Sequence, residues 1–142
     1  MPHRVLFVDV GNSCRGQIAV GFARALGLDA DSAGTMPARA VAPSAVLAMQ
    51  ERGIDISGLR PRHVEFGDLP RYERVISMGP GVAATDPDLP VTEHWPLDDP
   101  ANLEYETVRF LRDDIQRRVS RLAAEMVEWG ALPDPQGLPA AA

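Results

Sequence analysis

One short segment near the start of the chain, Asp9-Val-Gly-Asn-Ser-Cys14-Arg15-Gly16, concentrates residues that could bind an anion or take part in acid–base chemistry. Gly11 and Asn12 tolerate positive φ angles, so a loop that contains them can curl its N–H groups inward. A helix that begins after the loop adds the positive end of its dipole, and Arg15 can bind the same anion through two parallel hydrogen bonds. These features predict an oxyanion-binding loop with the members Val10, Gly11, Asn12, Ser13, Cys14 and Arg15. The alternative is an ordinary strand-to-helix turn with a surface arginine.

The elements on either side of this segment must hold the loop in place. Residues 4–8 form a short, apolar, β-branched run, which is typical of a strand buried on both faces. Apolar residues recur at helical spacing over residues 16–26, and Gly27 follows as a helix stop. The sequence therefore predicts a strand, a tight loop and a helix in direct succession.

The rest of the chain repeats the alternation of strand and helix patterns. We expect strands at residues 28–33, 74–78 and 91–95, helices at residues 43–50 and 104–129, and a polar loop at residues 54–66. The last helix is amphipathic, because its apolar residues recur every three or four positions. This order favours an α/β fold with a parallel sheet, in which ligands bind outside the carboxyl ends of the strands.

Length and charge exclude several classes of protein. The 142 residues suit a single domain, which we place at residues 1–130, and residues 131–142 form a Pro- and Ala-rich tail that we expect to be disordered. No apolar run reaches the roughly 20 residues of a membrane span, and no secretory signal is recognisable, so we expect a cytoplasmic protein that binds no membrane. A net charge of −6 disfavours binding to nucleic acid.

The counts of cysteine, lysine and histidine limit the chemistry further. The single cysteine, Cys14, excludes an internal disulfide and a cysteine-based metal site. Because every basic residue is arginine, Schiff-base chemistry is excluded as well. His3, His63 and His94 show no metal-ligand spacing. We therefore expect no metal and no cofactor.

The segment Val5-Leu-Phe-Val-Asp-Val-Gly-Asn-Ser-Cys-Arg15, with Gln17 after it, resembles the phosphate-binding loop of low-molecular-weight protein tyrosine phosphatases and of their thioredoxin-coupled arsenate reductase relatives. Further segments similar to this family follow in the family order over residues 4–128: Ser32-Ala-Gly-Thr35, Pro43-Ser-Ala-Val46, Gly53-Ile-Asp-Ile-Ser57, Arg74-Val-Ile-Ser-Met78, His94-Trp95 and Asp99-Pro-Ala101. The resemblance implies a four-stranded parallel sheet with helices on both faces.

The resemblance also implies roles for single residues. The family loop begins with a cysteine thiolate, and Asp9 occupies that position here. Arg15 matches the arginine that clamps phosphate, and Asn12 matches the residue that braces the loop. Asp99, followed by Pro100, matches the general acid that protonates the leaving oxygen. The catalytic candidates are therefore Asp9, Arg15 and Asp99.

Two further positions depart from the family pattern. A family serine that donates a hydrogen bond toward the thiolate is replaced by Gly16. Cys14 matches a second loop cysteine, which in the reductases is a redox partner. The places of the reductases' later cysteines are taken by Gly79 and residues 85–87. A single cysteine cannot form the disulfide that such a cascade requires, so arsenate reduction is the less favoured activity.

A carboxylate at position 9 alters the mechanism, because it is a much poorer nucleophile than a thiolate. We expect Asp9 to pair with Arg15 and so to neutralise the pocket. The favoured hypothesis is a catalytically impaired, phosphatase-like protein that binds phosphate, sulfate or an arsenate-like oxyanion, with a phosphoprotein as a candidate partner. The alternative is an active phosphomonoesterase, which acts through Asp9 or in which Asp9 is an introduced substitution for a natural cysteine. The sequence alone leaves an enzyme and a binding protein both open.

Overall fold

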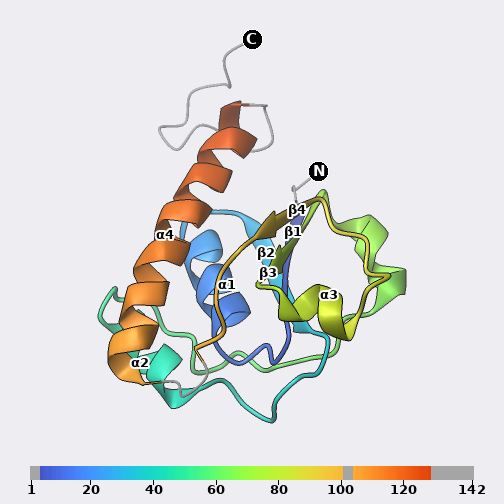
Figure 1. Cartoon of the computed structure of the whole chain (residues 1–142). Coiled ribbons are helices and arrows are strands. Elements are labelled where there is room, and N and C mark those ends of the chain that lie inside the picture. The colour runs from blue at the N-terminus through green and yellow to red at the C-terminus, as the bar shows by residue number, and fades with distance from the viewer. Residues whose placement is uncertain (1–3, 101–103, 129–142) are drawn as a thin grey trace.

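A four-stranded parallel sheet forms the centre of the structure, a computed structural model that describes residues 4–100 and 104–128 (Figure 1). The strands are β1 (Arg4–Asp9), β2 (Asp29–Gly34), β3 (Arg74–Met78) and β4 (Glu93–Trp95), and their order in the sheet is β2-β1-β3-β4. All three neighbouring pairs are parallel. The sheet that the resemblance implied is confirmed.

Helices cover both faces of the sheet, as expected. The helices α1 (Arg15–Ala25), α2 (Pro43–Gln50) and α4 (Tyr105–Glu128) lie together on one face, and α3 (Gly81–Thr85) lies on the other (Figure 1). The 3-10 helix η1 (Phe66–Arg71) supplies Leu69 to the second face. None of the helices within residues 4–100 and 104–128 is long and apolar enough to cross a membrane.

Alternation along β1 explains why this strand is apolar throughout. Val5 and Phe7 point into the core beneath α1, α2 and α4, whereas Leu6 and Val8 point into the smaller core on the side of η1 and α3. A strand buried on both faces needs apolar residues at every position, as the sequence predicted. The polar residues of β1, Arg4 and Asp9, stand at its two ends.

The structure adds two short helices to the elements that the sequence predicted. The sequence of η1 and α3 shows no helical periodicity, because these helices span only six and five residues. Each is stabilised by the burial of one apolar side chain, Leu69 in η1 and Val82 in α3. The predicted helix 16–26 and strand 28–33 lie within one residue of α1 and β2, and β4 is shorter than the predicted 91–95. The predicted tail at 131–142 lies outside the described residues.

The strand register brings three chain segments to one edge of the sheet. Val8 pairs with Ser77 and Met78 pairs with Trp95, so β1, β3 and β4 end side by side. The loops that follow these strands start at Val10, Gly79 and Pro96. The carboxyl edge is where ligands bind in open parallel sheets.

Candidate functional site

The loop between β1 and α1 has its carbonyl groups turned outward. The segment after β2 donates backbone hydrogen bonds to four of these carbonyls: Thr35 N to Asp9 O (3.1 Å), Met36 N to Val10 O (2.9 Å), Ala38 N to Gly11 O (2.8 Å) and Ala42 N to Ser13 O (2.8 Å). A planar trans peptide points its N–H away from its C=O. The loop N–H groups therefore face the opposite, concave side.

The N–H groups on that concave side are largely unused within the protein. Within residues 4–100 and 104–128, no acceptor bonds the N–H groups of Gly11, Ser13, Cys14 and Arg15. A left-handed backbone at Asn12, with φ of 53°, reverses the chain in the middle of the loop. Curled N–H groups at a helix N-terminus form an anion-binding arrangement.

Asp9 lies at the base of the loop and is 2% exposed. Its Oδ1 accepts the N–H of Asn12 at 2.6 Å, and its Oδ2 accepts the N–H of Gly16 at 2.9 Å. Burial raises the pKa of the Asp9 carboxyl, although the hydrogen bond from Gly16 and the charge of Arg15 oppose the rise. The carboxyl group thus occupies two of the donors at the centre of the loop.

Arg15 begins α1 and is 3% exposed. Its Nη1 donates to Met78 O at 2.9 Å and to Leu97 O at 3.2 Å, and its Nη2 lies 4.0 Å from Asp99 Oδ1. The expected ion pair between Asp9 and Arg15 is wrong, because the described contacts include none within 4.0 Å. Backbone carbonyls hold the guanidinium, and backbone N–H groups hold the carboxylate.

Gly79 makes this position of Arg15 sterically accessible. Its φ is +90°, and a Cβ atom there would overlap Nη1 of Arg15 and lie 2.5 Å from Leu97 O. Any side chain at position 79 would displace the guanidinium. The sequence did not indicate this role of Gly79, because the close approach involves residues more than fifteen positions away.

Asn12 ties the loop to three other segments. Its Nδ2 donates to Ser32 Oγ at 2.8 Å, its Oδ1 accepts the N–H of Arg62 at 3.0 Å, and its carbonyl accepts Gln17 Nε2 at 2.9 Å. Gly34 lies directly behind the loop, where a Cβ atom would be 2.5 Å from Val10 O. These bonds fix the loop from β2, from α1 and from the segment before η1.

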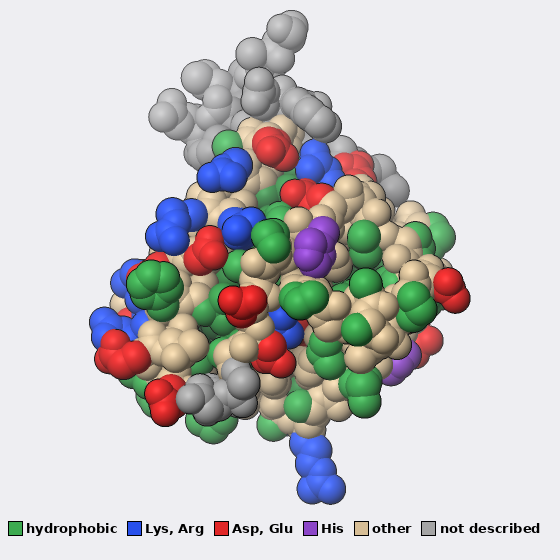
Figure 2. All heavy atoms as spheres, in the orientation of Figure 1, with side chains coloured by type: hydrophobic (Ala, Val, Ile, Leu, Met, Phe, Trp, Pro, Cys, Tyr) green, Lys and Arg blue, Asp and Glu red, His purple; other side chains and the backbone are tan. Residues whose placement is uncertain are grey.

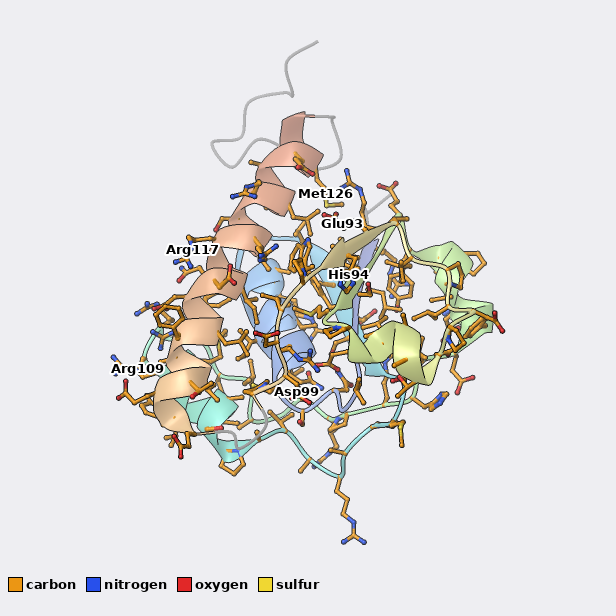
Figure 3. The ribbon with its side chains drawn as sticks, viewed as in Figure 1. Glu93, His94, Asp99, Arg109, Arg117 and Met126 are labelled. Atoms are coloured by element: carbon orange, nitrogen blue, oxygen red, sulfur yellow. The ribbon has the colours of Figure 1, made fainter. Side chains whose placement is uncertain are left out.

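Asp99 is the one site candidate that is open to solvent, with 70% of its side chain exposed. Figure 3 places it beside the loop that joins β1 to α1. Cys14 is the opposite case, since it is 4% exposed and burial, assisted by the charge of Asp9, raises the pKa of its thiol to about 12. Cys14 therefore stays a neutral thiol at neutral pH.

The side chains of Trp95, Tyr105 and Arg62 make their described contacts outside the loop. Trp95 is buried against Phe7, with ring centroids 5.6 Å apart. Tyr105 donates from α4 to Glu51, and the Arg62 side chain donates to Tyr72 OH at 3.3 Å. Within the described residues no group of three His, Cys, Asp or Glu side chains is placed to hold a metal ion.

Known proteins are similar to this chain over most of its length. Residues 4–130 match the family model described as low molecular weight phosphotyrosine protein phosphatase. The chain belongs to this family. It is 37% identical over 134 residues to the glutaredoxin arsenate reductase of Synechocystis sp., covering 87% of this chain and 98% of the relative.

Solved structures of arsenate reductases and low molecular weight phosphatases have a fold similar to that of this chain. An arsenate reductase in the phosphate binding state is 34% identical, with a TM-score of 0.73 and coverage of 87% of this chain and 98% of that chain. The low molecular weight protein tyrosine phosphatase from T. tengcongensis is 26% identical, with a TM-score of 0.75 and coverage of 87% and 99%. The family resemblance deduced from the sequence is confirmed.

Proposed function

We propose that this member of the phosphatase family binds a tetrahedral oxyanion in the loop of residues 10–15 but is impaired in catalysis. One observation carries the proposal: the Asp9 carboxylate sits at the base of the loop and accepts the N–H groups of Asn12 and Gly16. In this family that position is expected to hold the nucleophilic thiolate. The unbonded N–H groups around it and the phosphate-bound state of a relative that is 34% identical support the binding half of the proposal.

The chemistry of Asp9 supports the catalytic half. A carboxylate attacks phosphorus poorly, since its charge is shared between two weakly nucleophilic oxygen atoms and is stabilised here by two N–H donors. Cys14 does not replace the thiolate, because burial keeps it protonated.

Curated relatives of this chain are named arsenate reductases, and arsenate reduction is the activity that the chemistry of this chain supports least. Reduction of arsenate requires thiol groups as electron donors, and the chain has one buried cysteine. Arsenate therefore fits the proposal as a bound oxyanion and not as a substrate for reduction by this chain alone.

A second candidate function is hydrolysis of a phosphomonoester through Asp9, and the exposed Asp99 favours it. Asp99 lies 4.0 Å from Arg15 Nη2, at the edge where a leaving group would depart. In this scheme an Asp9 oxygen attacks phosphorus, Asp99 gives its proton to the leaving oxygen, and water then cleaves the acyl phosphate.

Phosphate binding and turnover, measured on the same preparation, test the proposal. Inorganic phosphate is titrated into the full chain by calorimetry, and an aryl phosphate is offered as substrate with and without magnesium. We expect binding without turnover, and Arg15→Ala should weaken binding about 10- to 100-fold, since a hydrogen bond to a charged group contributes roughly 1.5–3 kcal/mol. Arg60→Ala, an exposed arginine, is the control that should leave binding unchanged. Turnover of about 1 per second or faster would favour the phosphomonoesterase, and absence of binding would refute the site.

A further inference from the structure

We propose that Asp9 makes the loop selective for oxyanions that retain a proton, namely hydrogen phosphate and hydrogen arsenate, over sulfate and fully ionised phosphate monoesters. This inference rests on the proposed function and specifies the ligand class of the same site. The proposed selectivity follows from the position of the Asp9 carboxylate, a hydrogen-bond acceptor, among loop N–H groups that are all donors.

The carboxylate keeps acceptor capacity after its bonds to the loop are made. Each carboxylate oxygen has two lone pairs, and each accepts one backbone N–H here, from Asn12 and from Gly16. The unbonded N–H groups of Gly11, Ser13, Cys14 and Arg15 belong to the same short loop. An anion bound by these donors therefore comes into contact with Asp9, whose remaining lone pairs can only accept.

Because of the charges around the loop, a proton shared between Asp9 and the anion decides whether the two attract or repel each other. Arg15 supplies a full positive charge near Asp9, while Asp99 adds a second negative charge and Cys14 is neutral. A proton-free anion would meet Asp9 as a like charge in a buried place, where screening by solvent is weak. An anion with an O–H group can donate that proton to Asp9, which replaces repulsion by a charge-assisted hydrogen bond.

Gly16 is consistent with a carboxylate at this place. A Cβ atom at position 16 would lie 3.4 Å from Asp9 Oδ2 and 3.2 Å from both Asn12 Nδ2 and Ser32 Cβ. A serine there would crowd the larger carboxylate and compete for its lone pairs. The glycine leaves only its N–H as a donor to Asp9.

The protonation of the ligands separates them near neutral pH. Inorganic phosphate and arsenate keep at least one proton there, sulfate keeps none, and a phosphate monoester loses its last proton at about pH 6. We therefore expect hydrogen phosphate to bind at least about tenfold more tightly than sulfate or a fully ionised phosphate monoester at pH 7.5. Acidification should reduce the difference in affinity between phosphate and sulfate, because a protonated Asp9 can donate a hydrogen bond to sulfate.

The test is calorimetric titration of the full chain with sodium phosphate, sodium arsenate and sodium sulfate at pH 7.5 and pH 5, at constant ionic strength. Asp9→Asn replaces one carboxylate oxygen by an N–H donor, and Asp9→Ser removes the charge in a smaller side chain. Both should raise the affinity for sulfate and bring the phosphate-to-sulfate ratio at pH 7.5 to within about threefold. Asp88→Asn, an exposed carboxylate in another loop, should keep the full ratio.

The outcomes separate this inference from the proposed function. Phosphate and sulfate that bind the unmodified chain equally well at pH 7.5 would overturn the selectivity and leave oxyanion binding intact. A ratio that persists in a folded Asp9→Asn or Asp9→Ser variant would show that another residue selects the ligand. If neither anion binds the unmodified chain at either pH, the proposed function fails and the inference fails with it.

Discussion

Asp9 in the loop after β1 and Arg112 in the middle of α4 are both 2% exposed, yet the fold holds their charges in different ways. Arg112 donates to Glu51 Oε1 at 2.9 Å, to Asp113 Oδ1 at 2.9 Å and to Ala48 O at 2.8 Å. Its charge is balanced by two carboxylates within hydrogen-bond distance. Asp9 accepts backbone N–H groups only, and its nearest cationic side chain bonds to carbonyls.

The difference separates a structural cluster from a binding site. Arg109 also forms an ion pair with Glu51, with Nε 3.0 Å from Oε1, so the cluster around Arg112 is an ion network that joins α2 to α4. In Figure 2 acidic and basic side chains are interspersed along the side of the molecule that α4 forms. The loop around Asp9 has the reverse character, since several of its donors have no acceptor among the residues that the structure describes. Donors left over next to a buried charge indicate a place for a ligand.

The largest expected effect concerns the loop and its nucleophile. Asp9→Cys places a thiol beside the N–H groups of Asn12 and Gly16 and near Arg15, which should lower its pKa and activate it. We expect hydrolysis of an aryl phosphate to rise at least about a thousandfold over the unmodified chain. The measurement is steady-state release of the phenol.

Two controls accompany the cysteine variant. Adding Asp99→Asn should slow hydrolysis of a substrate with a poor leaving group, whereas Asp98→Asn should not. Gly16→Ser should raise the rate further, provided that Ser32 and Asn12 yield the few tenths of an ångström that its Cβ requires. A folded Asp9→Cys variant that binds phosphate without hydrolysing an aryl phosphate would contradict the roles given to Arg15 and Asp99.

The next effect concerns the structural cluster. Arg112→Met should lower the free energy of unfolding by about 2–3 kcal/mol, because it leaves the buried carbonyl of Ala48 without its donor and removes the ion pairs with the partly exposed Glu51 and Asp113. Phosphate affinity should not change. Urea denaturation gives the first quantity and calorimetry the second. Arg117→Met is the matched control on the same helix, where Figure 3 shows the side chain on the outer surface of α4. A loss of phosphate affinity in folded Arg112→Met would contradict the separation of the two regions.

A smaller effect on stability is expected at Gly79. Gly79→Ala should cost about 1–3 kcal/mol, since alanine is strained at φ of +90° and its Cβ would overlap the Arg15 guanidinium. Gly27→Ala has the same strain, with φ of +89°, but no atom within 4 Å of its Cβ. The difference between the two variants in thermal denaturation isolates the crowding of the new Cβ atom by Arg15 and Leu97 O. Equal losses would show that Gly79 does not position Arg15.

The smallest expected effect is a pH dependence of stability. Because the folded protein raises the pKa of Asp9 above its ordinary value of 3.8, it binds that proton more tightly than the unfolded chain does. The resulting stability is complete below about pH 4 and is lost as the pH rises through the folded pKa. On acidification, the free energy of unfolding of the unmodified chain should therefore rise relative to that of Asp9→Asn. Carboxylates whose pKa is lowered, such as Glu51 and Asp113, act in the opposite direction in both proteins and cancel in the difference.

Local patterns were sufficient to predict the strands, the long helices and the loop, because hydrophobic periodicity and the Gly-Asn turn are written in neighbouring residues. The contacts that shape the site were not predictable in this way. The bonds from residues 35–42 to the loop carbonyls, and the two carbonyls that hold Arg15, join residues 26 to 82 positions apart. The Asp9–Arg15 pair was predicted incorrectly because opposite charges on one loop suggest attraction. In the structure, N–H groups of the same loop bond Asp9, whereas two carbonyls from distant segments bond Arg15.

A titration of the uniformly nitrogen-15-labelled chain with sodium phosphate, followed in proton–nitrogen correlation spectra at constant ionic strength, tests the central claim most directly. Saturable shifts are expected for the N–H groups of Gly11, Ser13, Cys14 and Arg15, with little change for residues around Glu51 and Arg112. Loop signals that stay in place at phosphate concentrations of about 100 mM, or shifts confined to the α2–α4 cluster, would contradict it.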